Sequence, residues 1–156
     1  MKTPGIKEIK TELNHLHPAR LLEICLKMGK YKKENKELLT YLLFDSSDER
    51  MYIHEVKLQM DAMFSEVTKN NIYLARKNIR KILAFVNKQI KFSGLKVTEL
   101  ELLIHFCNKM KKSGYSIHLN SALGNVYFRQ VQKIKKVLST LHEDLQFDYT
   151  EEVRLL

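Results

Sequence analysis

The sequence predicts an all-α fold, and two observations support this prediction. Apolar residues recur three and four positions apart along almost the whole chain, which is the spacing that places them on one face of a helix. Glycine occurs 5 times and proline twice in 156 residues, mostly where one helical pattern stops and the next begins. We therefore expect helices joined by short connections throughout the chain.

Three helices are expected before residue 45. The first begins near Pro4, Pro18 opens the second, and Gly29 is expected to cap the end of the second. The third follows a polar start at residues 32–35. The residues predicted to be buried are Ile6, Ile9, Leu13 and Leu16, then Leu21, Leu22, Cys25 and Met28, then Leu38, Leu39, Leu42 and Leu43.

The fourth helix is expected after the polar segment 45–49. Ser46 followed three residues later by Glu49 fits a capping box, in which each side chain binds a backbone N–H group of the other residue. Residues 69–71 interrupt this helix, and Asn70 or Asn71 is expected to cap the next one. The predicted stripe of the fourth helix is Tyr52, Val56, Met60, Met63 and Val67.

The fifth helix has the most regular pattern, and Ser93 and Gly94 are expected to end it. Thr98 and Glu101 form a second potential capping box, which is expected to open a sixth helix that stops near Gly114. The predicted buried residues are Ile72, Ala75, Ile79, Ile82, Leu83, Val86 and Ile90 in the fifth helix, and Leu100, Leu103, Ile104, Cys107 and Met110 in the sixth.

Residues 115–119 alternate between apolar and polar, but the run is short and has no evident partner, so an extended connector is predicted. Asn120 or Ser121 is then expected to cap the seventh helix. Residues from about 144 to 156 are predicted to form an acidic, partly extended tail. The apolar residues assigned to the seventh helix are Leu123, Tyr127, Ile134, Leu138, Leu141 and Leu145.

These elements predict one helical domain over residues 1–156, built from about seven antiparallel helices. Two layouts fit: a multilayer bundle, or a short superhelix like those of helical repeat proteins. The third and sixth helices carry apolar residues around much of their circumference, so they must be covered on several sides. This favours several layers over a simple four-helix bundle.

The chain is basic, with 27 lysines and arginines against 18 acidic residues and a formal net charge of +9. Such a charge favours an acidic partner, although a lysine-rich solvated surface has the same composition. The clearest candidate contact surface is a row on the fifth helix, where cations four residues apart repel one another unless something negative lies nearby. Its members are Arg76, Lys77, Arg80, Lys81, Lys88 and Lys91. The alternative is internal pairing with Glu55, Asp61 and Glu66 of the preceding helix.

Two further basic clusters are candidates for binding. Lys32 and Lys33 lie beside Tyr31, which is a possible stacking group for a nucleic-acid base. A third row on the seventh helix consists of Arg129, Lys133 and Lys136. The sequence leaves open whether these rows merge into one surface, and whether the acidic tail folds back onto one of them.

Catalytic and metal sites find little support. His15 and His17, like His105 and Cys107, are two residues apart, and side chains at that spacing on a helix point in different directions. Cys25 and Cys107 fall on apolar stripes and form no CxxC pair, so both are expected to be buried, reduced thiols. We therefore expect no enzyme activity, no metal and no cofactor.

We predict a non-enzymatic binding or scaffold module that uses a basic helical face on an acidic protein partner. The alternative is a nucleic-acid-binding protein that uses the same face on phosphates. No apolar run is long enough for a signal peptide or a membrane span, so we expect a cytoplasmic protein. The sequence does not indicate an oligomeric state.

Overall fold

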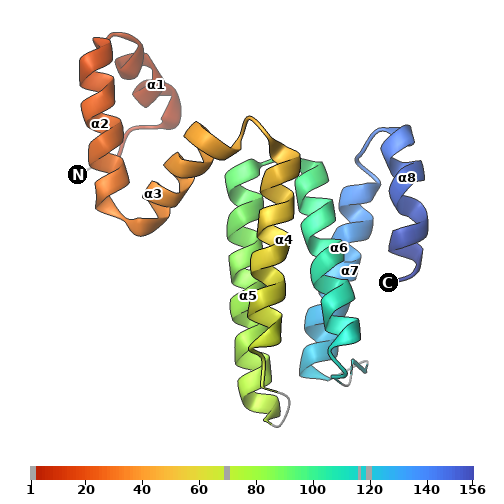
Figure 1. Cartoon of the computed structure of the whole chain (residues 1–156). Coiled ribbons are helices and arrows are strands. Elements are labelled where there is room, and N and C mark those ends of the chain that lie inside the picture. The colour runs from red at the N-terminus through yellow and green to blue at the C-terminus, as the bar shows by residue number, and fades with distance from the viewer. Residues whose placement is uncertain (1–2, 69–70, 116, 119–120) are drawn as a thin grey trace. The chain divides into compact units, whose positions relative to one another are not determined.

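The computed structural model describes all residues except 1–2, 69–70, 116 and 119–120. The described residues form eight α-helices and one π-helical turn, without a β-strand (Figure 1). The predicted all-α fold class is therefore confirmed. The chain divides into two compact units, residues 1–44 and 45–156, and each is described by itself. A single domain over residues 1–156 stays a prediction.

The first unit contains α1 (Ile6–Asn14), α2 (Pro18–Tyr31) and α3 (Lys33–Thr40). Pro18 occupies the first turn of α2, as predicted, and the His17 imidazole accepts a hydrogen bond from the backbone N–H of Ala19. None of these three helices contains a fully buried residue. A unit this short buries a smaller fraction of its surface than a larger domain does.

The predicted role of Gly29 as a helix cap is wrong, because α2 continues through it to Tyr31. A Cβ atom at position 29 would lie 2.7 Å from Cδ1 of Leu39 on α3. The missing side chain therefore serves the close packing of α3 on α2. Leu22, Cys25 and Met28, which were predicted to be buried, are exposed.

The end of the third helical segment also differs from the prediction. A π-helical turn follows α3 over Tyr41–Asp45, and its wider winding shifts the positions that share a face. Tyr41 is the buried residue of this turn. Leu42 and Leu43, predicted to be buried from a 3.6-residue period, are exposed.

The second unit is a bundle of α4 (Glu49–Ser65), α5 (Ile72–Ser93), α6 (Lys96–Lys112), α7 (Ala122–Leu138) and α8 (Glu143–Arg154). Helix α6 packs against α4, α5 and α7, and α8 packs against α7. Buried residues occur around most of the circumference of α6, as the sequence predicts. The fully buried apolar side chains of α6 are Leu100, Leu102, Leu103, Ile104, Phe106, Cys107 and Met110.

The capping box predicted from Ser46 and Glu49 is wrong. Asp48 is the N-cap of α4, and its carboxylate accepts a hydrogen bond from the backbone N–H of Met51. Asp, like Ser, is a favoured N-cap residue. Placing the cap at Asp48 makes Glu49 the first residue of the helix and frees its carboxylate for contacts outside α4.

The second predicted capping box is also wrong. Helix α6 begins at Lys96, so Thr98 and Glu101 lie inside it rather than at its cap. The Thr98 side chain is fully buried, and its hydroxyl donates a hydrogen bond to the carboxylate of Glu49. Ser93, at the end of α5, donates to the same carboxylate. One side chain of α4 therefore joins α5 and α6.

Helix α5 follows its prediction closely. Asn71 caps it by accepting hydrogen bonds from the backbone N–H groups of Tyr73 and Leu74. Gly94 ends it with a φ of 68°, a conformation that favours glycine. Of the predicted stripe, only Ile72, the first residue of the helix, is exposed. Lys69 and Asn70 lie outside the described residues.

The C-terminal region differs most from the prediction. Helix α7, capped by Ser121 as predicted, ends at Leu138 instead of continuing through Leu145. The supposed extended tail is the helix α8, which His142 caps. Val153 of α8 is buried, so burial against the bundle stabilises a segment that its acidic composition alone does not mark as helical. Of the expected connector, Ser116, Leu119 and Asn120 lie outside the described residues.

The two thiols differ in exposure, and this difference predicts different reactivity. Cys25 on α2 is exposed, whereas Cys107 on α6 is buried, and burial raises the pKa of the Cys107 thiol to about 12. The thiolate is the reactive form. We expect a chromogenic disulfide reagent at mildly alkaline pH to modify one thiol of the native protein quickly and the second only after unfolding. Cys25→Ser should remove the fast reaction; a fast reaction that persists in this variant would contradict the assignment.

Gly124 near the start of α7 is predicted to be intolerant of a side chain. A Cβ atom there would lie 1.9 Å from the backbone oxygen of His118 and 2.8 Å from Oγ of Ser121. We expect Gly124→Ala to lower the free energy of unfolding by about 1–3 kcal/mol, since overpacking exceeds the gain in helix propensity. Urea unfolding followed by circular dichroism measures this. The neighbouring exposed position provides the control, and Asn125→Ala should be close to neutral.

Candidate functional site

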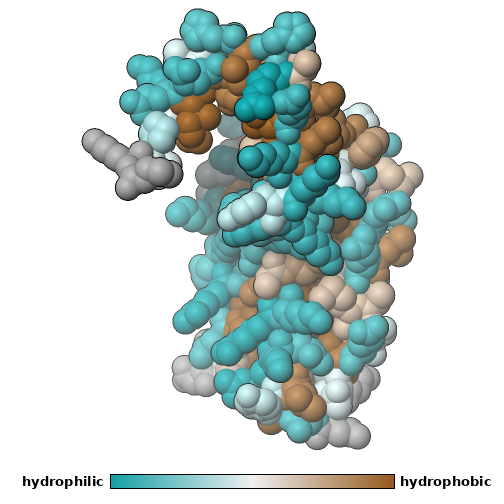
Figure 2. Space-filling model, turned by 90° about the vertical axis from the view of Figure 1, so that its left-hand side faces the viewer, coloured by the Kyte–Doolittle hydropathy of each residue, from teal (hydrophilic) through white to brown (hydrophobic). Residues whose placement is uncertain are grey.

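Helix α5 holds the predicted row of cations in place by burying its opposite side. Ala75, Ile79 and Val86 are completely buried. Because the helix turns by about 100° per residue, residues 77, 80, 81, 84 and 91 lie on the opposite side, and all of them are exposed. Figure 2 views the second unit from the end at which α5 lies in Figure 1, and hydrophilic side chains project from the surface there.

Most cations of this row have no anionic partner within the described part of the chain. Lys77, Arg80, Lys81 and Lys91 are exposed and Arg76 is half-buried; none of these five is within 4.0 Å of a carboxylate among the described residues. Lys88 is half-buried and has a partner, so it is set apart. We call Lys77, Arg80, Lys81 and Lys91 the α5 cations.

The internal pairing considered for this row is absent from the described contacts. Asp61 of α4 binds α6 instead: its Oδ1 lies 2.6 Å from Nε2 of His105 and its Oδ2 lies 2.9 Å from Nζ of Lys109. Glu55 and Glu66 are exposed and form no ion pair with a described residue. The α5 cations are therefore left to the solvent.

Apolar side chains adjoin the α5 cations at the start of the helix. Ile72, Tyr73 and Leu74 are 60%, 70% and 42% exposed. Tyr73 is four residues before Lys77 and seven before Arg80, so these three side chains lie on one side of the helix. Sequence reasoning assigned Ile72 to the core and therefore missed this apolar group. We call Ile72, Tyr73 and Leu74 the α5 apolar patch.

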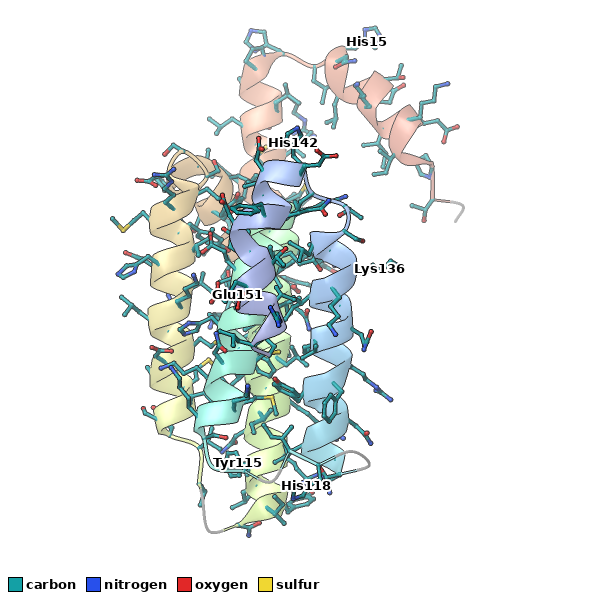
Figure 3. The ribbon with its side chains drawn as sticks, turned by 90° about the vertical axis from the view of Figure 1, so that its right-hand side faces the viewer. His15, Tyr115, His118, Lys136, His142 and Glu151 are labelled. Carbon is teal, nitrogen blue, oxygen red and sulfur yellow. The ribbon has the colours of Figure 1, made fainter. Side chains whose placement is uncertain are left out.

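The row on α7 is interrupted. Arg129 and Lys136 are exposed, but Nζ of Lys133 lies 2.7 Å from a carboxylate oxygen of Glu99 on α6. Figure 3 labels Lys136 on α7 and Glu151 on α8, and the acidic helix α8 lies beside α7. Neighbouring carboxylates lower the positive potential around this row, so it is a weaker candidate for binding anions than the α5 cations.

Lys32 and Lys33 belong to the first unit and are both exposed. Nζ of Lys32 lies 5.8 Å from the centroid of the Tyr31 ring, which is within cation–π distance. Nζ of Lys33 lies 3.9 Å from a carboxylate oxygen of Glu37. These local contacts partly satisfy both side chains.

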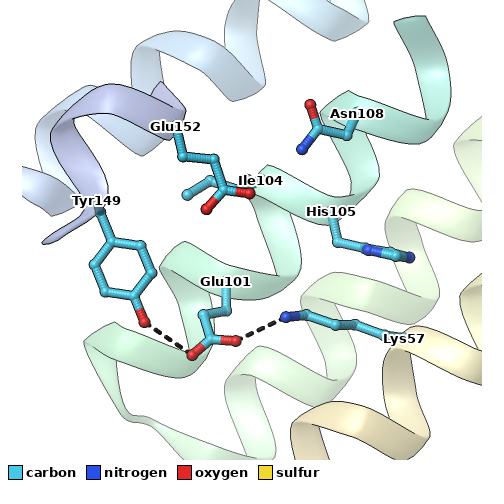
Figure 4. Close-up of a pocket in the computed structure, with 7 residues that line it drawn as sticks. All are labelled: Lys57, Glu101, Ile104, His105, Asn108, Tyr149 and Glu152. Carbon is cyan, nitrogen blue, oxygen red and sulfur yellow. Dashed lines mark hydrogen bonds and ion pairs between the residues drawn. The ribbon is translucent and has the colours of Figure 1, made fainter. Parts of the chain in front are cut away.

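Sequence reasoning missed a polar network that joins α4, α6 and α8. The Glu101 carboxylate on α6 accepts hydrogen bonds from Nζ of Lys57 at 2.7 Å and from the Tyr149 hydroxyl at 2.9 Å (Figure 4). Burial, followed by the hydrogen bond to the Glu101 carboxylate, raises the pKa of Tyr149 to about 12. The protonated hydroxyl therefore persists over the physiological range and fixes α8 against α6.

This network surrounds a small hollow. Its volume is about 70 Å3, and Ile104, His105, Asn108 and Glu152 complete its lining (Figure 4). Pockets for small-molecule ligands measure about 300–1,000 Å3. The hollow is therefore large enough for a few water molecules and too small for an ordinary metabolite.

A signal for this network was present in the sequence. Lys57 and Asp61 are four residues apart, and so are Glu101, His105 and Lys109, which places each set on one helix face. Local spacing instead suggests Glu101 as part of a cap, and leaves Asp61 as one possible partner for the row on the fifth helix. Only the packing of α4 on α6 brings the two sets together.

Two further findings bear on possible activities. Among the described residues, no three His, Cys, Asp or Glu side chains cluster in a way that could hold a metal ion. No helix in the described part of the chain combines the length and apolar character needed to cross a membrane.

The chain gives no match to known family models, curated proteins or solved structures.

The contacts of Asp61 predict a pH-dependent contribution to stability. Partial burial tends to raise the pKa of Asp61, but hydrogen bonds from Lys109 and His105 outweigh it and hold the pKa below the ordinary value of 3.8. The stabilisation is therefore present above pH 3.8 and is lost as the pH falls through the lowered pKa. Because the Asp61 side chain is 37% exposed, solvent screening limits its contribution to less than about 1 kcal/mol.

We expect Asp61→Asn to lower the free energy of unfolding at neutral pH, and the difference from the wild type to shrink below pH 3.8. Urea unfolding at a series of pH values tests this. Glu55→Gln, an exposed change on the same helix, is the matched control and should have little effect at any pH. A deficit in Asp61→Asn that stays constant into strong acid would show that the carboxylate charge is not its source.

Proposed function

We propose that this protein is a binding module without catalytic activity of its own, which uses the outer face of α5 to hold an acidic protein partner. The observation that carries the proposal is the combination of four exposed α5 cations, without a described carboxylate within 4.0 Å, and the adjoining α5 apolar patch. The two unpaired thiols are compatible with a reducing compartment such as the cytoplasm.

The charge arrangement supports an anionic partner. Lys77 and Lys81 are one helical turn apart, and Arg80 lies between them. Like charges at this spacing destabilise a helix by about 0.2–0.5 kcal/mol per pair. A partner carboxylate relieves that repulsion and also gains hydrogen bonds from the guanidinium group of Arg80.

The apolar patch favours a protein over a nucleic acid. Protein interfaces combine aromatic and arginine side chains near their centre, where an apolar anchor excludes water, with charges around the rim. Tyr73 and Arg80 match that composition, and Ile72 and Leu74 add aliphatic area that a phosphate backbone does not use. The expected ligand is an acidic segment that also carries apolar side chains.

A nucleic acid is the second candidate, and one observation favours it. The Tyr73 ring is 70% exposed and lies one turn from Lys77, so a base stacked on the ring would bring its phosphate near a cation. In that case affinity depends steeply on salt concentration and little on the apolar patch.

The absence of catalytic activity is part of the proposal. The described hollow of about 70 Å3 is small, and its charged side chains Lys57 and Glu101 bind each other. The thiol of Cys107 is buried with a pKa of about 12, so almost no thiolate forms there at neutral pH. These features favour a structural role for the hollow and its surrounding network.

We expect the double variant Arg80→Glu with Lys81→Glu to lose at least about tenfold in affinity for an acidic helical peptide that carries leucines. Fluorescence anisotropy with that peptide, with a leucine-free acidic peptide and with single-stranded DNA measures the effect. The wild type should bind the leucine-containing peptide best. The fold should be kept, because Lys77 and a glutamate at position 81 attract each other.

The matched control is Lys7→Glu with Lys10→Glu, which makes the same change in net charge at exposed positions of α1. It should retain peptide binding, since the proposed contact depends on position and not on total charge. Tighter binding of DNA than of either peptide would favour the second candidate. Failure of the wild type to bind any of the three probes would refute the proposed function.

A further inference from the structure

Helix α8 has the chemistry that the α5 face is proposed to recognise. Its sequence, EDLQFDYTEEVR, contains five acidic residues and one arginine. Leu145, Tyr149 and Val153 lie on its inner side, half-buried or buried. Phe147 is 84% exposed, and Asp144 and Glu151 lie one helical turn before and after it on the outer side. The outer side is therefore an acidic surface with an aromatic side chain at its centre.

The carboxylates on this surface are largely uncompensated. Asp148 is exposed and forms no ion pair with a described residue. Asp144 is paired only with His142, the cap of its own helix, and Glu151 only with Arg154 at 3.8 Å. All four of these paired side chains are at least 73% exposed, so solvent screens both pairs.

The two complementary surfaces lie on opposite sides of the second unit. Helix α5 packs against α4 and α6, whereas α8 packs against α7. Figure 1 shows α5 at one end of this unit and α8 at the other, with the remaining helices between them. The outer side of α8 therefore cannot reach the outer side of α5 in the same unit. Of the basic rows onto which the sequence left the acidic tail free to fold, the row on the fifth helix is therefore not the one; α8 packs against α7 instead.

We infer that the partner of the α5 face is a second copy of this chain, which presents the outer side of its α8. The inference rests on the proposed function and names the partner for the same surface. Phe147 of one copy meets the α5 apolar patch of the next, and Asp148 and Glu151 meet the α5 cations. Because the two surfaces are different and face opposite ways, the contact is heterologous and generates open chains of copies.

The contact is expected to be weak. One aromatic anchor and a few exposed charges form a small interface, and copies with a net charge of +9 repel each other at long range. Near physiological salt, repulsion between charges more than about 8 Å apart is largely screened, whereas close contacts are less affected. Association should therefore be detected at high protein concentration and near physiological salt.

Sedimentation velocity of the chain 1–156 over a range of concentrations, reaching roughly millimolar protein, tests the inference. The wild type should show an average mass that rises with concentration. Two variants should each stay monomeric: Arg80→Glu with Lys81→Glu, and Asp148→Lys with Glu151→Lys. Phe147→Ala should weaken association by at least about tenfold. Circular dichroism should show native helicity in each variant, because all substituted side chains are exposed.

The decisive measurement is an equimolar mixture of the two charge-reversed variants. Each variant alone brings like charges together, whereas in the mixture every contact between two unlike variants pairs opposite charges, so association should return. The control Lys7→Glu with Lys10→Glu should associate like the wild type. A wild type that stays monomeric throughout, or a mixture that stays monomeric while the wild type associates, overturns the inference.

The inference and the proposed function can fail separately. If the wild type stays monomeric but still binds the leucine-containing acidic peptide through Arg80 and Lys81, only the inference fails. If neither self-association nor peptide binding occurs, both fail. If the α8 variant associates as strongly as the wild type while the α5 variant does not, the α5 face binds another part of the second copy, and the assignment to α8 is wrong.

Discussion

The burial of α6 is the constraint on which the rest of the second unit depends. A helix with apolar residues around most of its circumference must be covered on several sides, and α4, α5 and α7 cover it. Glu49 adds a polar tie at one end, where hydroxyl groups from α5 and α6 donate to its carboxylate. Each covering helix faces α6 with its apolar side, and this orientation turns the α5 cations outward.

Local patterns in the sequence predict this arrangement well where they are periodic, and poorly where a partner is distant. The stripe from Ala75 to Ile90 needs no tertiary information, because helical spacing alone defines it. Thr98 followed by Glu101 looks like a cap locally. The Thr98 hydroxyl instead donates a hydrogen bond to the carboxylate of Glu49, which lies 49 residues earlier in the chain. Likewise, Gly29 resembles a terminator until Leu39 is placed against it.

The candidate site also has features that the sequence predicts and features that depend on distant contacts. The α5 cations could be predicted, because their exposure follows from the burial of the opposite side of their own helix. Their lack of a described carboxylate partner could not be predicted, because α4 packs against both α5 and α6, and only the packing directs Asp61 to His105 and Lys109 of α6. The acidic region after residue 142 is the clearest failure: composition favours a solvated tail, whereas Tyr149 and Val153 dock it as a helix.

The docking of α8 has a consequence for its charges. Tyr149 donates to Glu101, the Tyr127 hydroxyl of α7 donates to the backbone oxygen of Leu156, and Lys111 of α6 donates to that of Leu155. These contacts hold the inner side of α8, so Phe147 and its flanking carboxylates are presented on an ordered helix. An acidic helix held in this way binds with a smaller loss of conformational entropy than a flexible tail of the same sequence. The interactions that hold α8 away from its own α5 thus keep it in an ordered form suited to the proposed contact with the α5 of another chain.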